Sequence, residues 1–309
     1  MIDPPAPLAA ELSPMKRWWL SSIVSLCVLA VPTVACAQMD PYFTAINVPV
    51  PQDTLMLMAL PDFQVARTGP DFVTGMGMIE YGITPRWTAG VMGEGQKIGG
   101  LPLTYGGLRI NTYARVFPHD RLFHFTLYGE YEDLNQAALY KMEVSGFGGE
   151  DLVGPLSLAR RTPARTFEQR AIAYHDWGRI DVTANFISET DLDAPHDNSF
   201  GYAVGLFRQP RWTGMTVMPG MSPPPAWSPT RLGYGLEMIG ALGNTGQFGI
   251  DWHREQAYLG PVFSYTLAPH WSLHVAPAFG LSAVSDPFMF RVGVGYSIDH
   301  VARRIARSF

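Results

Sequence analysis

Charged residues are scarce in this 309-residue chain. Only 16% of the residues are charged and 47% are hydrophobic, and the formal net charge is −5. Typical globular proteins carry about 25% charged residues. The hydrophobic content excludes an intrinsically disordered chain, which combines low hydrophobicity with high net charge. The sequence also lacks a stripe of lysine and arginine, which argues against nucleic-acid binding, because such proteins neutralise phosphates with basic side chains.

Cysteine is nearly absent, and both cysteines fall in a segment with the features of a secretory signal. Lys16-Arg17 precede an apolar run over 18–34, and a small-x-small site ending at Ala37 follows it. We expect export and cleavage near Ala37, with Met15 a better start than Met1 because signal peptides begin at their charged end. The alternative is a membrane anchor, since about 17 apolar residues reach the lower limit for spanning.

Removal of 1–37 takes away Cys27 and Cys36. The mature chain then has no disulfide, no thiolate nucleophile and no cysteine-based metal site. No apolar run after residue 37 approaches the ~20 residues of a transmembrane helix.

Period-two alternation of apolar and polar residues takes the place of long apolar runs. In 288–298, Phe288 and Phe290 share one face with further apolar residues, while Arg291 and Gly293 lie on the other. Such alternation is typical of strands with one apolar face. We predict strands at 54–66, 72–82, 86–94, 104–116, 121–132, 165–175, 180–186, 199–208, 231–241, 248–253, 256–267, 271–281 and 288–298.

Short turns alternate with longer loops along the chain, which is typical of outer-membrane barrels. If both chain ends lie on one side, the strand number must be even. Counting 212–218 as a strand gives 14, whereas dropping a weak candidate such as 165–175 gives 12; 14 is slightly favoured because it puts the short turns on one side. The fold class is therefore an all-β, antiparallel up-and-down barrel of 12 or 14 strands.

This barrel accounts for most of the chain. The predicted organisation is an upstream extension with a cleaved signal peptide at 1–37, a periplasmic N-terminal segment at 38–53, the barrel at 54–298 and a short C-terminal tail at 299–309.

A soluble barrel or sandwich would also alternate, with its apolar face inward. Aromatic residues beside the turns favour a membrane barrel instead, because such rings form girdles at headgroup depth: Tyr81, Trp87, Tyr265 and Trp271. We expect apolar side chains to face outer-membrane lipid and their polar neighbours to face the lumen.

The last predicted strand carries a polar-x-Gly-x-x-aromatic-x-apolar pattern, formed by Arg291, Gly293, Tyr296 and Ile298. Patterns of this kind end outer-membrane proteins, so we expect the barrel assembly machinery to bind this strand. Alternatively Phe309, the terminal residue, is the assembly signal.

Three segments carry a family resemblance: Glu80–Trp87 (EYGITPRW), Tyr258–Tyr265 (YLGPVFSY) and the strand at 290–298. They are similar to segments of bacterial outer-membrane barrels of a phenol meta-pathway family, over most of 54–298. These are strand and turn signatures without catalytic residues. The family is loosely assigned to uptake of small hydrophobic or aromatic compounds, so the resemblance implies a transporter-like or structural barrel rather than an enzyme.

The candidate lumen residues are of mixed charge. They are Arg109, Asn111, Arg115, Glu130, Glu132, Asp181, Glu237, Asp251, His253 and Arg291. Either they form a structural network of ion pairs, since charges inside a narrow barrel must pair, or they form a constriction that selects solutes. A barrel of 12 or 14 strands falls between a filled interior and an open channel, so we expect a narrow or plugged pore, with loop 135–163 able to fold inward.

A passive pore or transporter for small solutes, hydrophobic or aromatic ones among them, is the leading functional hypothesis. A hydrolase on the barrel is an alternative, because Asp251 and His253 share a predicted strand face, as is a structural or adhesion barrel. We expect no catalytic residue, cofactor or metal. The methionine pairs at 56/58 and 76/78 are expected to be flexible gap-fillers.

Overall fold

The computed structural model describes residues 41–46, 49–67, 69–117, 123–135, 165–193, 198–212 and 223–307. The predicted signal peptide, residues 213–218 and almost all of loop 135–163 lie outside these ranges. Within them, no helix is long and apolar enough to cross a membrane.

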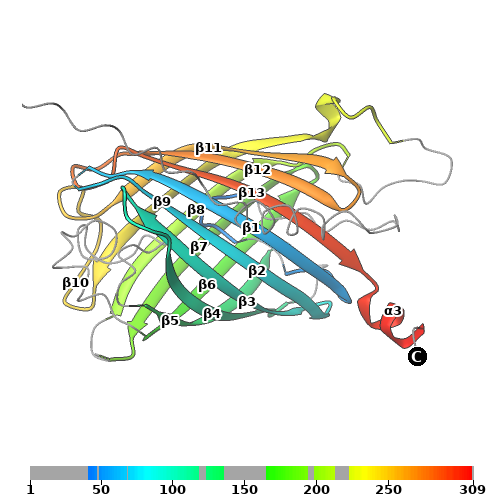
Figure 1. The fold of residues 1–309 in the computed structure, drawn as a ribbon, viewed down its shortest axis with the longest axis horizontal. Coiled ribbons are helices and arrows are strands. Elements are labelled where there is room, and N and C mark those ends of the chain that lie inside the picture. The colour runs from blue at the N-terminus through cyan, green and yellow to red at the C-terminus, as the bar shows by residue number, and fades with distance from the viewer. Residues whose placement is uncertain are drawn as a thin grey trace, which may run out of the picture. The chain divides into compact units, whose positions relative to one another are not determined.

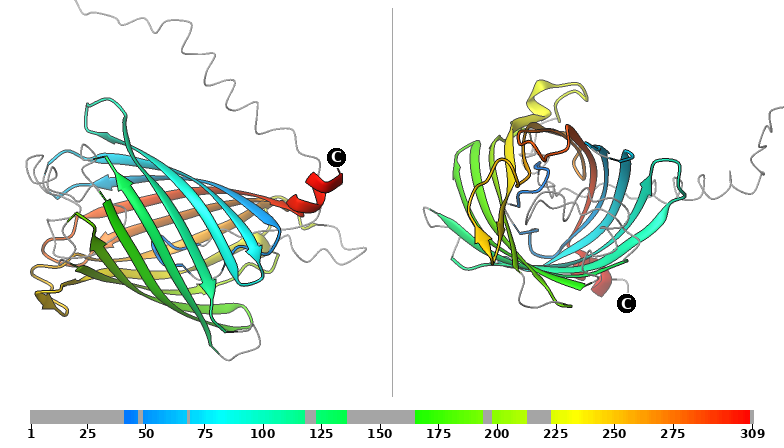
Figure 2. Two further views of the ribbon diagram at one scale, coloured as in Figure 1. Left: turned by 90° about the horizontal axis from the view of Figure 1, so that it is seen from below. Right: turned by 90° about the vertical axis from the view of Figure 1, so that its left-hand side faces the viewer.

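Twelve antiparallel strands close into a barrel (Figures 1 and 2). They are β1 (Thr54–Val65), β2 (Phe72–Thr84), β3 (Trp87–Ile98), β4 (Thr104–Arg115), β5 (His124–Leu134), β6 (Arg165–Trp177), β7 (Ile180–Asp191), β8 (Asn198–Arg208), β9 (Leu232–Asn244), β11 (Ala257–Ala268), β12 (Trp271–Gly280) and β13 (Phe288–Asp299). The ring closes where β13 pairs with β1, for example Tyr296 opposite Leu57. The predicted all-β antiparallel barrel is confirmed.

The two faces of the sheet are chemically opposite, as the alternation predicts. Large apolar side chains point outward and are exposed, among them Phe63, Ile79, Ile110, Leu127, Val204, Leu236 and Phe279. Polar and charged side chains point inward and are buried, among them Asp62, Gln96, Arg109, Glu130, Thr183, Glu237 and Arg291. An apolar exterior around a polar, hydrogen-bonded interior suits a closed sheet in hydrocarbon.

The slightly favoured count of 14 strands is wrong. Strand β8 pairs directly with β9, and β9 pairs directly with β11, so these pairings leave no room for a further barrel strand between them. The turn at 243–246 consequently lies at the opposite end of the barrel from the turn at 84–86.

The predicted strand at 248–253 is also wrong. Only β10 (Gln247–Phe248) forms there, as a short hairpin on the end of β9. Gly249 has φ 147°, a value that glycine adopts readily, and a turn over 251–254 follows. The alternation misled because Phe248 is 62% exposed and its ring packs against Phe200, which extends the outer apolar face without a strand.

The chain before β1 differs most from expectation. The sequence predicts a periplasmic segment at 38–53, but residues 41–46 and 49–50, here called the strap, lie inside the barrel. Tyr42, Phe43, Ala45 and Val50 are buried, and the strap bonds to side chains of β6, β7 and β9. Figure 2 (right) shows this segment in blue within the ring.

A short helix, α3 (Val301–Arg307), follows β13 and is tied to the start of β1. Asp53 accepts the Val301 amide on its carbonyl at 3.2 Å and the Ala302 amide on Oδ1 at 2.7 Å. These first helical amides have no partner within the helix. The Ala302 hydrogen bond lowers the pKa of the Asp53 carboxyl, helped by the Tyr81 hydroxyl and by His300 and Arg303.

Replacing Asp53 with Ala should release α3 from the barrel. We expect faster hydrogen–deuterium exchange at the Ala302 amide and faster tryptic cleavage after Arg303 and Arg304, because the Ala302 amide loses its acceptor carboxylate and the helix start loses the nearby negative charge.

In the wild-type protein, the contact between α3 and Asp53 should weaken in the same way at acidic pH. A lowered folded-state pKa means that the carboxylate stabilises the contact above its unfolded pKa and that the stabilisation is lost as pH falls below about 4. Asp53→Asn should lack this pH dependence. An Asp53→Ala protein whose Ala302 exchange matches wild type would contradict the tie.

Candidate functional site

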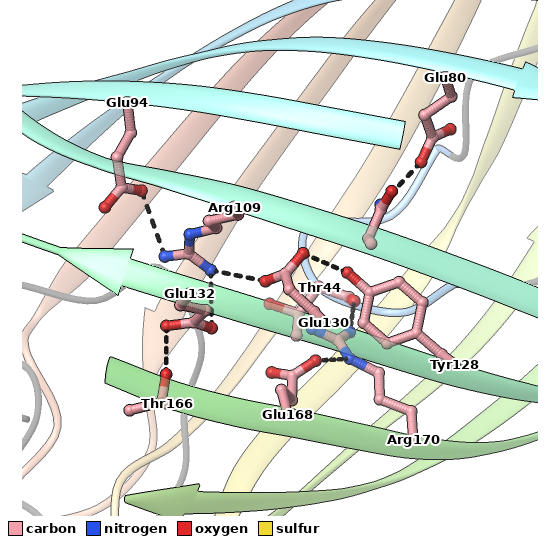
Figure 3. A network of polar contacts seen from close by, with 11 residues as sticks. Thr44, Glu80, Glu94, Arg109, Tyr128, Glu130, Glu132, Thr166, Glu168 and Arg170 are labelled. Carbon is pink, nitrogen blue, oxygen red and sulfur yellow. Dashed lines mark hydrogen bonds and ion pairs between the residues drawn. The ribbon is translucent and has the colours of Figure 1, made fainter. Parts of the chain in front are cut away.

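A cluster of ion pairs lies on the inner wall formed by β3, β4 and β5. Arg109 is 1% exposed, and its guanidinium contacts Glu94 at 3.2 Å, Glu130 at 3.1 Å and Glu132 at 3.2 Å. The three carboxylates come from β3 and β5, the two strands that flank β4, and converge on Arg109 in Figure 3. Period-two alternation places all four side chains on the lumen face, where burial makes pairing obligatory.

Hydrogen bonds extend this cluster across β6. The Tyr128 hydroxyl donates to Glu130 at 2.5 Å, and Thr166 donates to Glu132 at 2.7 Å. Next to them, Arg170 pairs with Glu168 at 2.5 Å and donates to the Thr44 carbonyl at 2.6 Å (Figure 3). The wall network therefore reaches the strap.

Two further polar groups occupy other parts of the wall. Glu80 accepts from Asn111 at 3.0 Å and from the Tyr113 hydroxyl at 2.8 Å. Arg291 forms a two-pronged pair with Asp62, with both contacts at 2.7 Å. Bidentate arginine–carboxylate pairs hold their geometry firmly, so β13 is fixed to β1 on the inside as well as by main-chain pairing.

Glu237 is the main anchor of the strap. Its carboxylate accepts the amides of Phe43, Thr44 at 2.7 Å and Ala45 at 2.6 Å. Two strands away, on β7, Asn185 accepts the Ile46 amide at 2.8 Å and donates to the Ile46 carbonyl at 2.9 Å. These contacts satisfy the main chain of a segment that has no neighbouring strand, which burial requires.

An apolar patch borders the charged cluster on the inner surface, because Met92 of β3 stands opposite Arg109 of β4 in the strand register. Met56, Met58 and Leu60 of β1, Met76 and Met78 of β2 and Met92 of β3 form it together with Val50 of the strap. Met78 stands opposite both Met58 and Met92 in the strand register. We call these six β-strand residues the methionine wall.

A cavity of about 270 Å³ remains between the methionine wall, the strap and the polar wall. Its polar lining includes Glu80, Asn111, Tyr128, Arg170 and Arg291. The space is smaller than most drug-sized ligand pockets, so it suits only small solutes.

Most of the predicted lumen residues are where the sequence puts them. The residues on the inner wall are Arg109, Asn111, Glu130, Glu132, Asp181, Glu237 and Arg291, with Arg115 at the end of β4. Asp251 and His253 do not lie on the inner wall. Both lie in the connection from β10 to β11, where the His253 amide donates to Asp251 at 3.0 Å. The pair is therefore absent from any strand face.

Several residues of the wall were not among the predicted candidates. They are Asp62, Thr183, Asn185, Glu189 and the pair Glu168 and Arg170. Continuing the period-two register through each strand would have found them, because Asn185 and Glu189 share parity with Asp181, and Glu168 and Arg170 share parity with Ile172.

Loop 135–163 lies outside the described residues beyond Asn135, so its predicted inward fold stays a prediction. Among the residues that the structure does describe, no group of three or more His, Cys, Asp or Glu is placed to hold a metal ion.

Replacing Arg109 with Gln should destabilise the barrel by about 3–5 kcal/mol, because three buried carboxylates lose their shared cation. Arg165→Gln is the matched control: Arg165 pairs with Asp193 in an exposed position, so its loss should cost at most about 1 kcal/mol. Urea unfolding in lipid vesicles, followed by tryptophan fluorescence, measures both. Equal stability of the two variants would show that the Arg109 cluster does not hold the barrel.

No family model matches the chain, and no curated protein matches its sequence. Its resemblance to the phenol meta-pathway family therefore stays a prediction. Among solved structures, the chain is similar to the KdgM porin (9% identity, TM-score 0.47, covering 79% of this chain and 99% of that one), to a COG4313 outer membrane channel from Pseudomonas putida F1 (12%, 0.48, 84% and 100%) and to the NanC porin (8%, 0.48, 78% and 98%). At these similarities, the assignment of a closed barrel is based on the chain's own strand pairing.

Proposed function

We propose that this protein is an outer-membrane channel that lets small solutes cross passively. The observation that carries the proposal is a closed barrel with an apolar outer face around a polar lumen that retains a cavity. The predicted export signal supports the location, because outer-membrane barrels are exported before assembly. The end of the barrel at which β1 begins would face the periplasm.

The strap sets the size of the passage in this proposal. It crosses the lumen and is held on β6, β7 and β9, so a solute passes through the space that remains beside the methionine wall. This arrangement is a narrow pore, and permeation is expected to be slow compared with a general porin.

The solute class follows from the two walls. Thioether side chains are flexible and polarizable, and they adapt to apolar and aromatic ligands. Tyr113 and Tyr128 add aromatic surface next to them. We therefore propose small solutes with an apolar or aromatic part, which agrees with what the family resemblance implies.

The charge of the polar wall is a second property that selects among solutes. Inward-facing acidic residues outnumber the basic ones: Asp62, Glu80, Glu94, Glu130, Glu132, Glu168, Asp181, Glu189 and Glu237 against Arg109, Arg115, Arg170 and Arg291. A lumen with an excess of one sign concentrates counter-ions. Cations and solutes with a positive charge should therefore be preferred over anions.

Planar-bilayer recordings test the channel. Wild type should show small unitary currents with a reversal potential that reports cation preference. The full-length Tyr42→Ala/Phe43→Ala variant should conduct more, because both aromatic anchors of the strap are lost, whereas Phe248→Ala, on the outer surface, should match wild type. Folded barrels that pass no ions in any of these forms, or that prefer anions, would contradict the proposal.

Current block tests the methionine wall. Benzyltrimethylammonium should stay in the pore longer than tetramethylammonium, which has the same charge but no ring. In Met76→Gln/Met92→Gln the difference in dwell time should shrink about fivefold, as the loss of roughly 1 kcal/mol of apolar contact implies. Identical dwell times for the two cations in wild type would rule out an apolar subsite.

A further inference from the structure

Main-chain groups of the strap form one set of its contacts with the inner wall. Over four consecutive residues, the amides of Phe43, Thr44 and Ala45 donate to Glu237 and that of Ile46 donates to Asn185. Amides are common to every peptide, so these contacts do not depend on which side chains the strap carries.

The wall also donates to strap carbonyls. Arg170 donates to the Thr44 carbonyl at 2.6 Å, while Thr183 and Asn185 donate to the Ile46 carbonyl at 2.8 and 2.9 Å. The Asn185 side-chain amide both accepts the Ile46 amide and donates to the Ile46 carbonyl, which are the two hydrogen bonds that a neighbouring strand would form. The set is therefore a built array of donors and acceptors for an extended peptide.

Two aromatic side chains of the strap occupy fitted places. The Tyr42 ring lies over Gly205, where an added Cβ would come within 2.2 Å of the ring, and its hydroxyl donates to Asp181 at 2.8 Å. The Phe43 ring lies under the Arg291 guanidinium, 4.2 Å from its centroid. Ligand preference thus comes from two successive aromatic positions at the start of the main-chain array.

We propose that this part of the lumen is a peptide-binding site whose resident occupant is the strap. Short extended peptides with two successive aromatic residues near their N-terminus are the ligand class. The groups named above all belong to barrel strands, so they stay in place when the strap leaves, and the cavity of about 270 Å³ borders the strap along residues 41–46. This inference goes beyond passive permeation, and its test measures binding rather than current.

The probe is a fluorescent peptide with the sequence of residues 41–46, PYFTAI. Fluorescence anisotropy is measured with detergent-purified protein in three forms: wild type, a form lacking residues 41–48, and full-length Tyr42→Ala/Phe43→Ala. We expect saturable binding to the two altered forms and at least about tenfold weaker binding to wild type, where the tethered strap competes. A heat-modifiable gel shift confirms that each barrel is folded; should the deletion not fold, the full-length variant decides.

Backbone recognition is tested with a second peptide. N-methylation of the amides that correspond to Phe43, Thr44 and Ala45 removes the donors to Glu237 and should weaken binding about tenfold or more. A peptide of different sequence that keeps aromatic residues at its second and third positions should bind within a few-fold of PYFTAI.

Matched substitutions locate the site. In the Tyr42→Ala/Phe43→Ala background, Glu237→Gln should weaken PYFTAI about tenfold. Glu255→Gln should not, although Glu255 is a buried carboxylate that accepts a main-chain amide, from Asp251 at 2.6 Å in the connection before β11.

The proposal is overturned if neither folded altered form binds PYFTAI, or if the N-methylated peptide binds as well as the unmodified one. Binding of PYFTAI with rejection of every other peptide that has aromatic residues at its second and third positions would also overturn it, since the site would then hold only the chain's own plug. A barrel that binds peptides but carries no current would contradict the channel proposal and would still support the peptide-binding site.

Discussion

The absence of hydrogen-bond partners in hydrocarbon is the constraint on which the rest of this structure depends. Every main-chain amide and carbonyl at membrane depth must pair within the protein, and a sheet that closes on itself leaves no open edge. Pairing of β13 with β1 achieves that closure. Once the ring is closed, alternation fixes the chemistry of both faces, because successive side chains point to opposite sides of a strand.

The same requirement acts inside the barrel in a different form. Charged side chains on the lumen face are shielded from bulk water by the ring and the strap, and each needs a partner. Arg109 meets this need for Glu94, Glu130 and Glu132, and Arg291 meets it for Asp62. Glu237 finds its partners in the strap, because main-chain amides of the strap donate to its carboxylate. The polar side chains of the lumen and the position of the strap therefore depend on each other.

Particular strands show how far sequence patterns reach. The candidate at 165–175 was the weakest because Glu168 and Arg170 interrupt the pattern, yet β6 forms there and the two residues pair with each other on the inner face. The candidate at 248–253 had a cleaner alternation and forms no barrel strand. The difference lies in neighbours: β6 is bordered by β5 and β7, whereas both edges of β9 are already occupied by β8 and β11.

The sequence by itself determined the all-β class, most of the strand positions, the outward apolar face and most residues of the polar wall, because period-two alternation is a local property. Only the tertiary structure decided that 12 strands close the ring, that residues 41–46 lie inside it, and that the methionines of β1, β2 and β3 meet in one wall. These features depend on pairings between residues as far apart as Ala45 and Glu237, and no pattern along the chain records which distant groups will come into contact.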